Sequence, residues 1–513
     1  MKTFEKFGIV SPISLFLEKN KDEFTREDLL RVIESFDIER FTFHYTALDG
    51  RIKELKIPIF DREHAELLLT EGERVDGSSL FKGIVDVGKS DLYVLPLYKT
   101  AFINPFDERS LDFMCRFLTG DGKLAGYTPD SVLFKASKLL KEKTGLELYA
   151  LGELEFFLIG EEPTKLFPNE KQKAYHQSAP FSKTTEVMTE ILTVISQVCG
   201  NVKYAHNEVG VLENIVSELP ELNGKSAEQV EVEFLLAPVE EVGDILSLSK
   251  WIIRNIAFQY GYTASFVPKL EVGHAGSGMH FHMALMKDGK NIMLNDKFEL
   301  SEEARVLIGG LTTYAPTITA FGNTVAASYL RLVPGQEAPT KVCWSECNRT
   351  AMIRVPLGWS NLNNLAKKIN PQQKEDYLSR DSRQTVEIRT PDGSAFPQFV
   401  LAALALAAEW GFTHKAEALE LAKKCYASGN IHTPEYDHLD DLPTCCVESS
   451  ELLLKNKELY TVDGIFTEKI IDHFATMLKN ENDMGLDQKL SHLDEDQMYE
   501  ETRKVMHRAI HKY

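Results

Sequence analysis

The feature that most constrains this chain is a pair of carboxylates inside an apolar run, YALGELEFFLIG at residues 149–160. The residues around Glu153 and Glu155 are typical of a short buried strand, and alternation along a strand places both carboxylates on one face. Burying two ionised carboxylates side by side is costly unless positive charge lies between them. Either basic residues pair with them, or a cation bridges them, or the strand lies at an edge with one solvated face.

Four other stretches show the same pattern of charged or imidazole side chains in strand-like runs. They carry Glu208 in YAHNEVG, Glu231 and Glu233 in EQVEVEFLL, His280 and His282 in GHAGSGMHFHMAL, and Glu387 with Arg389 in QTVEIRTPDG. A single acid of this kind usually marks a solvated face, and a single histidine is usually a hydrogen-bonded core residue. Their repetition favours one shared polar site.

The side chains of that site suit a particular chemistry. Carboxylates with an imidazole form a hard, oxygen-rich ligand set that favours Mg²⁺ or Mn²⁺ over a structural zinc, and paired divalent ions commonly bridge nucleotide phosphates. Arginines in apolar or turn contexts can hold phosphoryl and carboxylate groups bidentately. These are Arg331, Arg349, Arg354 and Arg389. With no P-loop or kinase signature, the combination predicts an ATP-dependent ligase acting on an acid.

Bulk composition narrows the partners. The chain has 513 residues, and 57 basic against 77 acidic residues give a net charge of −20, which argues against general nucleic-acid binding. The longest apolar stretch, 399–408, is too short to span a bilayer, and no signal peptide is recognisable. Seven scattered cysteines are typical of reduced thiols. We therefore expect a cytoplasmic protein that binds neither nucleic acid nor membrane.

The order of elements predicts an α+β protein with two domains. Residues 1–124 mix a helix at 25–36 with strands in FTFHYTAL, IKELKIPIF and DLYVLPLY, and residues 125–513 form a larger domain with a C-terminal helical tail. In the larger domain, helices are predicted at 184–198, 245–259, 301–314 and 399–411. The third is expected to end there because Pro316 follows.

Six separated motifs resemble the glutamine synthetase family, bacterial type I, in the family's order. They are VDGSS, GELEFF, HNEVG, GSGMHFHM, NTVAASYLRLVPGQEAPTKVCWSECNRTAMIRVP and VEIRTPD. The resemblance implies an N-terminal β-grasp domain followed by a catalytic domain with an antiparallel sheet and helices. It also implies active sites shared between neighbouring subunits of a ring, with two stacked hexamers forming a homododecamer.

The resemblance also implies roles for individual residues. One Mg²⁺ or Mn²⁺ would be held by Glu155, Glu208 and Glu231, and the other by Glu153, His280 and Glu387. His282, Arg349 and Arg354 would lie at the ATP phosphates, Arg331, Arg389 and Gly276 at glutamate, and Glu337 in a flap over the intermediate. Asp76 and Ser79 would reach the neighbour's site, where Asp76 and Tyr175 would accompany ammonium.

Two departures from the family pattern bear on these assignments. The turn HAGSG has Ala275 where type I enzymes usually carry an asparagine that helps to hold the amino-acid end of glutamate. The segment between Glu208 and Glu231 is much longer than the family's short turn. Three further acids, Glu213, Glu218 and Glu233, are therefore rivals of Glu231 as metal ligand.

The expected activity is glutamate–ammonia ligation. ATP would phosphorylate the side-chain carboxylate of glutamate, and ammonia would displace phosphate from γ-glutamyl phosphate to give glutamine. An alternative is a γ-glutamyl ligase for a larger amine, such as a polyamine or ethanolamine. A non-catalytic structural or regulatory relative is a third possibility, but such copies are expected to lose metal carboxylates or phosphate arginines, and this chain retains both sets.

Overall fold

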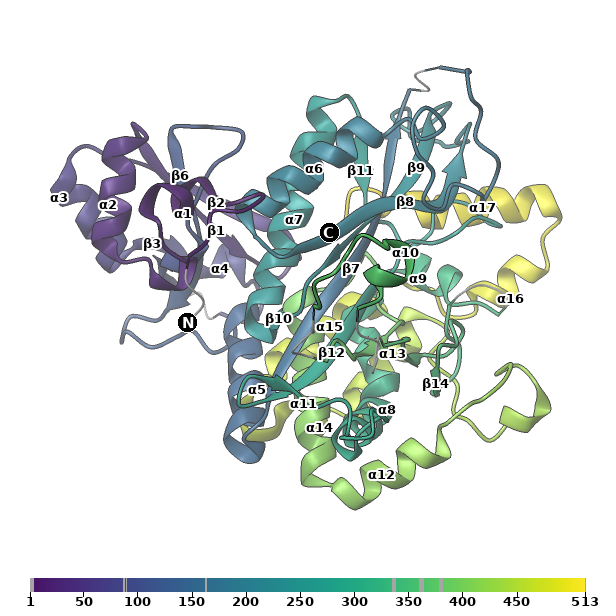
Figure 1. Cartoon of the computed structure of the whole chain (residues 1–513). Helices are drawn as coiled ribbons and strands as arrows, with labels where there is room; N and C mark the ends of the chain where they lie inside the picture. Colours follow the sequence, from purple (N-terminus) through teal and green to yellow (C-terminus); the bar gives the residue numbers. More distant parts are fainter. Residues whose placement is uncertain are drawn as a thin grey trace.

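The computed structural model describes residues 4–85, 88, 90–161, 164–334, 338–358, 364–377 and 382–512. A small N-terminal domain lies beside a larger one (Figure 1). The N-terminal sheet has the order β2-β1-β6-β4-β3, with β5 paired to β6, and only its β1–β6 pair is parallel among the described strands. Its strands are β1 (Arg40–Thr46), β2 (Ile52–Pro58), β3 (Glu73–Asp76), β4 (Asp91–Pro96), β5 (Phe102–Ile103) and β6 (Ser110–Leu118).

Short helices accompany this sheet. They are α1 (Pro12–Leu17), α2 (Arg26–Ser35), α3 (Arg62–Glu71) and α4 (Gly77–Leu80), with 3-10 turns η1 (Lys21–Glu23) and η3 (Tyr98–Thr100). Helix α2 begins where its sequence predicts, because the Thr25 and Asp28 side chains cap each other's backbone N–H groups. The helix predicted at 25–36 is thereby confirmed to within one residue at each end.

The larger domain is built on a second sheet with the strand order β14-β15-β16-β12-β7-β9-β8. All of its pairs are antiparallel except β14–β15, so the predicted antiparallel sheet is confirmed with one parallel pair at its edge. The strands are β7 (Glu147–Gly160), β8 (Val202–Leu212), β9 (Ser226–Phe234), β10 (Ala237–Pro238), β11 (Thr263–Ser265), β12 (Met279–Lys287), β13 (Lys290–Asn291), β14 (Trp344–Glu346), β15 (Ile353–Val355) and β16 (Val386–Ile388).

Helices pack beside this sheet and against one another (Figure 1). They are α5 (Pro129–Thr144), α6 (Thr185–Val198), α7 (Val239–Gln259), α8 (Glu302–Gly322), α9 (Ala326–Arg331), α10 (Ala366–Ile369), α11 (Pro397–Thr413), α12 (Lys415–Lys424), η4 (Pro434–Tyr436), α13 (Cys446–Lys455), α14 (Glu458–Thr461), η5 (Val462–Gly464), α15 (Glu468–Lys479), α16 (Leu486–Ser491) and α17 (Glu495–His507). The apolar run at 399–408 lies in α11, which packs between α5 and α8. Among the described helices, none has the length and apolarity to cross a membrane.

Helix α8 corrects one prediction. It continues through Pro316 to Gly322, although the sequence predicts an end at residue 314. Proline inside a helix removes one backbone hydrogen bond and costs about 3 kcal/mol. Almost the whole of α8 after its first turn is buried against α11, α12 and α13, and this packing outweighs the local penalty.

The two domains are joined by buried and half-buried ion pairs. Lys99 Nζ lies 2.6 Å from Glu241, and Arg116 Nη2 donates to Asp244 over 2.6 Å. The predicted boundary at 124/125 falls in the connection between β6 and α5, and remains a prediction.

Candidate active site

A pocket of about 720 Å³ opens over the larger sheet. Strands β7, β8, β9 and β12 line it, together with the turn at 273–276 and four arginines from helix α9, strand β15 and the segments around residues 349 and 389. The pocket collects most of the predicted site residues, which are Glu153, Glu155, Tyr175, Glu208, Glu231, Gly276, His280, His282, Arg331, Arg349, Arg354 and Arg389. Of the described residues that line it, none belongs to the N-terminal domain.

Glu153 lies at the centre of one group of ligands. The β7–β12 register pairs it with His280, and His282 follows on the same strand face. His280 Nδ1 and His282 Nε2 donate to its two carboxylate oxygens over 2.8 and 2.9 Å. Burial alone would raise the pKa of Glu153, but the His282 charge and the two hydrogen bonds hold that pKa well below its usual value. The carboxylate therefore stays ionised.

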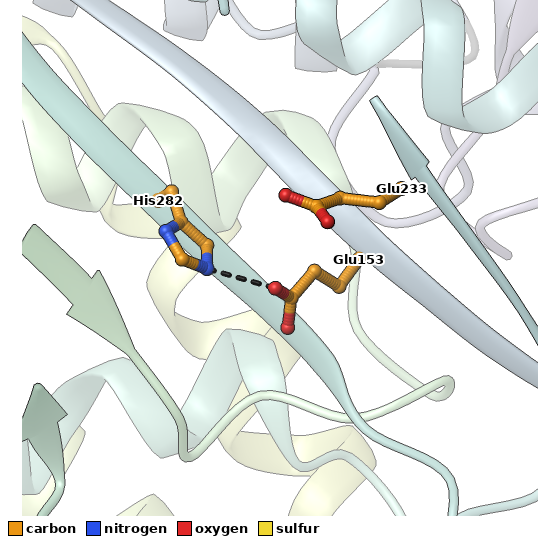
Figure 2. Close-up of side chains that lie close together, drawn as sticks. All are labelled: Glu153, Glu233 and His282. Carbon is orange, nitrogen blue, oxygen red and sulfur yellow. Dashed lines mark hydrogen bonds and ion pairs between the residues drawn. The ribbon is translucent and has the colours of Figure 1, made fainter. Parts of the chain in front are cut away.

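Two overlapping sets of possible metal ligands meet at Glu153. One is Glu153, His280 and Glu387; the other is Glu153, Glu233 and His282, shown in Figure 2. Glu387 also accepts hydrogen bonds from Arg354 over 2.7 Å and from Arg389 over 2.5 Å. Glu233 accepts one from Lys203 over 2.6 Å, so part of its charge is already compensated.

A second group joins His206, Glu208 and Glu231. His206 Nε2 lies 3.0 Å from a Glu231 oxygen. His206 is not among the predicted ligands, although His206 and Glu208 lie two residues apart on one strand, just as His280 and His282 do. Two of the three rival ligands lie elsewhere: Glu213 lines a different pocket, and Glu218 lies 3.9 Å from Lys504. The third, Glu233, lies in this pocket, but it groups with Glu153 and His282 and not with Glu208.

Glu155 lies beside this second group. Its carboxylate accepts hydrogen bonds from the Gly278 N–H over 2.9 Å and from Gln229 over 3.0 Å. Burial, followed by the nearby Glu208 charge, raises the pKa of Glu155 to about 8. Burial and neighbouring carboxylates also raise the pKa of Glu231. Carboxyl groups with too little positive charge around them are what a divalent-cation site presents before the ion binds, so this donor set fits Mg²⁺ or Mn²⁺.

Four arginines line the same pocket as these clusters. Arg331 is buried, and its Nη1 donates to the Thr390 carbonyl over 2.9 Å. Arg389 donates from Nε to the Arg349 carbonyl over 3.1 Å, which ties the loop bearing Arg349 to the end of β16. The Arg349 side chain is exposed at the pocket, where it can meet an anionic substrate.

Two glycines in the turn before β12 lie where there is no room for a larger side chain. A Cβ on Gly278 would lie 2.6 Å from His280 Nε2 and 3.0 Å from a Glu155 oxygen. A Cβ on Gly276 would lie 2.5 Å from the Pro268 carbonyl. The Ala275 N–H, at the position where the family has asparagine, donates to Gln172 Oε1 over 2.7 Å.

Of the predicted residues that the structure describes, Asp76, Ser79 and Glu387 do not line this pocket. Glu387 is fully buried, but it accepts hydrogen bonds from Arg354 and Arg389, which do line it. Asp76 and Ser79 lie on the N-terminal domain, where the Ser79 hydroxyl donates to Asp76 over 2.6 Å. This bond, with those from Ser78, lowers the pKa of the exposed Asp76 carboxyl to about 2, so the group is ionised at neutral pH. Glu337 lies outside the described residues. Tyr175 does line the pocket, with its ring stacked on His176.

Fold and site together define a two-domain protein in which acidic groups that could hold cations share one pocket with four arginines. Comparison with known proteins agrees with this class. The family model for the glutamine synthetase β-grasp domain matches residues 37–120, and that for the glutamine synthetase catalytic domain matches residues 126–494. The chain belongs to the glutamine synthetase family, whose members are ATP-dependent ligases.

Individual relatives are distant but similar over nearly their whole length. Glutamine synthetase of Thermus thermophilus is 28% identical, in an alignment that covers 88% of this chain and 94% of the relative. Glutamine synthetase of Escherichia coli K12 is 27% identical, and the alignment covers 89% of this chain and 96% of the relative. A protein of Cupriavidus pinatubonensis named 3-hydroxylaminophenol mutase is 28% identical, and the alignment covers 88% of this chain and 95% of that protein. The Plasmodium falciparum glutamine synthetase structure shares the fold with a TM-score of 0.71 at 21% identity, covering 92% of this chain and 98% of its own.

Divalent-cation affinity is expected to increase as the pH rises from about 6.5 to about 8.5. Without a cation, the pKa of Glu155 is about 8 and that of Glu231 is raised, so an ion must displace protons at the lower pH. Each displaced proton weakens binding about tenfold per pH unit below the pKa. Titration with Mn²⁺ at three pH values measures this, and Glu155→Gln should flatten the dependence. Equal affinity at all three values would contradict it.

Proposed function

We propose that this protein is a glutamate–ammonia ligase that forms glutamine from glutamate, ammonium and ATP. The observation that carries the proposal is the meeting, in one pocket, of two carboxylate–histidine groups with Arg331, Arg349, Arg354 and Arg389. Phosphoryl transfer to a carboxylate needs this combination, because both reactants are anions and their repulsion must be neutralised. The same pocket in a non-catalytic relative would have no reason to keep buried acids at this cost.

The donor groups divide into two cation sites. Glu153, His280 and Glu387 would hold one Mg²⁺ or Mn²⁺, and Glu208 and Glu231, with Glu155 beside them, would hold the other. When bound, the cations would neutralise the phosphates of ATP. His206 adds an imidazole to the second site that the family resemblance did not predict.

The protein's own residues would act in two steps, phosphoryl transfer to glutamate and then the attack of ammonia. Arg349 and Arg354 would stabilise the phosphoryl group as it passes from ATP to the glutamate side chain, leaving ADP and γ-glutamyl phosphate. Arg331 and Arg389, beside Gly276, would hold glutamate, and His282 would face the phosphates. Ammonium would lose a proton beside Asp76, and the ammonia formed would attack the acyl carbon. The C–O bond to phosphate would break, phosphate would leave, and the nitrogen would lose one more proton to give the amide. Glu337 would belong to the flap that keeps water from the acyl phosphate.

Ammonium recognition requires a second subunit in this proposal. Asp76 is ionised and exposed on the N-terminal domain, and no described residue of that domain lines the pocket of its own chain. A ring in which each Asp76, with Ser79, reaches the neighbour's Tyr175 and Glu208 would supply the missing carboxylate. Two stacked hexameric rings in the cytoplasm are the assembly we expect.

A larger amine is the second candidate acceptor. It is favoured by Ala275, which departs from the family's asparagine, and by the structure titled apo GmaS without ligand, which shares the fold with a TM-score of 0.68 at 19% identity. The ionised Asp76 favours ammonium, because a small hydrated cation needs a charged acceptor to replace its water. A wide apolar amine pocket would have less use for that charge.

A panel of amines tests the acceptor. Wild-type protein with ATP, Mg²⁺ and glutamate is expected to use ammonium with a higher kcat/KM than methylamine, ethanolamine or putrescine. Asp76→Asn should reduce kcat/KM for ammonium about a hundredfold or more, because the charged acceptor that replaces the water around ammonium is lost. The KM for ATP should change little. A wild type that prefers any alkylamine would replace the ammonium proposal with the larger-amine ligase.

A further inference from the structure

The C-terminal helix α17 lies beyond the part of the chain that matches the family model, which ends at residue 494. Its last residue, His507, is buried and leaves only 3% of its surface exposed. A buried imidazole at the end of a surface helix indicates a specific connection, because both ring nitrogens need partners when they leave water.

Both ring nitrogens of His507 have a hydrogen-bond partner, and the two partners belong to different segments of the chain. Nε2 donates to the Leu270 carbonyl over 3.0 Å, and Nδ1 accepts from the Ser217 hydroxyl over 2.9 Å. These two bonds fix one neutral tautomer. Burial lowers the pKa of His507, which keeps the ring neutral at physiological pH. Ser217 lies in the long segment between Glu208 and Glu231 that departs from the family pattern.

A second contact joins the same helix to the residue after Leu270. Arg503, one turn before His507, donates from Nε to Glu271 over 2.8 Å. The other Glu271 oxygen accepts from the Val272 N–H over 3.2 Å. Helix α17 therefore holds both the backbone and a side chain of residues 270–272.

Residues 270–272 lead directly into the turn that lines the pocket. His274, Ala275 and Gly276 face the pocket, and the Gly278 N–H donates to Glu155. The segment between the α17 contacts and Gly276 is only a few residues long, so a shift of Leu270 is transmitted to the pocket wall. The close approach of Gly276 to the Pro268 carbonyl leaves little room to absorb such a shift.

We propose that His507, with Arg503, is a positioning residue that holds the turn 273–278 in its substrate-binding position through Leu270 and Glu271. The long segment 213–225 takes part by supplying Ser217, which fixes the His507 tautomer. The inference rests on the proposed function in one respect, because it takes glutamate as the substrate that this turn contacts. It assigns a role to a helix outside the family match and to an insertion that the family pattern does not explain.

Three variants of the full-length protein test this. His507→Phe keeps the ring volume but removes both hydrogen bonds, and it is expected to raise KM for glutamate about tenfold while kcat and KM for ATP stay within about twofold. His507→Gln retains an N–H near the position of Nε2 and should recover most of the lost affinity. Arg508→Ala is the matched control, because Arg508 lies in the same C-terminal segment but pairs with Glu481 and not with Glu271. It should leave KM for glutamate unchanged.

Hydrogen exchange measured by mass spectrometry gives a readout that needs no substrate. Amides of residues 270–278 should exchange faster in His507→Phe than in wild type or His507→Gln. Unchanged exchange in that segment, or an equal rise of KM in His507→Phe and Arg508→Ala, would overturn the positioning role. A wild type that does not act on glutamate would instead remove the proposed function, and the exchange comparison would still decide the role of His507.

Discussion

Replacing Glu153 with glutamine is expected to lower kcat about a thousandfold. Glu153 is the acceptor for both His280 and His282 and belongs to two of the three ligand groups. Glutamine keeps the shape but removes the charge, and a unit charge about 4 Å from its partner is worth roughly 4 kcal/mol at an effective dielectric near 20, or about three decades in rate. Steady-state turnover at saturating ATP, glutamate, ammonium and Mg²⁺ measures the loss.

Glu147→Gln is the control for that variant. Glu147 is the first residue of the same strand β7, but its side chain is partly exposed and pairs with Lys141 at the surface. Surface ion pairs contribute about 0–1 kcal/mol, so this variant should keep wild-type turnover. Turnover of Glu153→Gln within about threefold of wild type, with thermal stability preserved, would contradict the assignment of Glu153 as a cation ligand.

Two inactive variants are expected to restore each other's activity when they assemble together. Asp76→Ala damages the N-terminal domain, and Arg349→Ala damages the pocket. If each site takes Asp76 from a neighbour, random mixing of equal amounts leaves roughly a quarter of the sites intact, because each half is intact with a probability of about one half. Co-expression of differently tagged chains, followed by tandem purification and assay, measures the recovery.

A second mixture makes this result specific. Arg349→Ala and Arg354→Ala both damage the pocket of their own chain, so no arrangement of these two chains yields an intact site. This mixture should stay inactive although it forms the same mixed assemblies. Recovery in both mixtures, or in neither when mass spectrometry confirms mixed rings, would show that Asp76 does not complete a neighbour's site.

Much of the site could be predicted because strand geometry is strict. Alternation places Glu153 with Glu155, and His280 with His282, on one face, and the antiparallel register then sets Glu153 opposite His280. Apolar residues on either side of each acid identify the strands as buried. The resemblance to a known family supplied the grouping of these motifs around one site, which alternation alone does not give.

The remaining features depend on contacts between distant segments. The continuation of α8 through Pro316 is decided by packing against α11 and α12, which local propensity cannot represent. His206 shows the same alternation as the predicted ligands and could have been found. The pairing of His507 with Leu270 and Ser217 has no sequence signal, because the three residues are brought together only when α17 packs against the two segments that carry Leu270 and Ser217.

Strand β7 is a part of this chain where substitutions that move the site residues would also disrupt the fold. It pairs with β9, β10, β11 and β12, and it carries both Glu153 and Glu155. A register slip of one residue would turn both carboxylates away from the pocket and expose the apolar face of the strand, so a mutation that misplaces the acids also costs the fold. Apart from Gly276 and Gly278, the turn at 273–278 is not constrained in this way, and neither is the segment at 213–225 between β8 and β9. New acceptor specificities should therefore arise by change in these loops, while the acids of β7 persist unchanged even in lineages whose substrates have shifted.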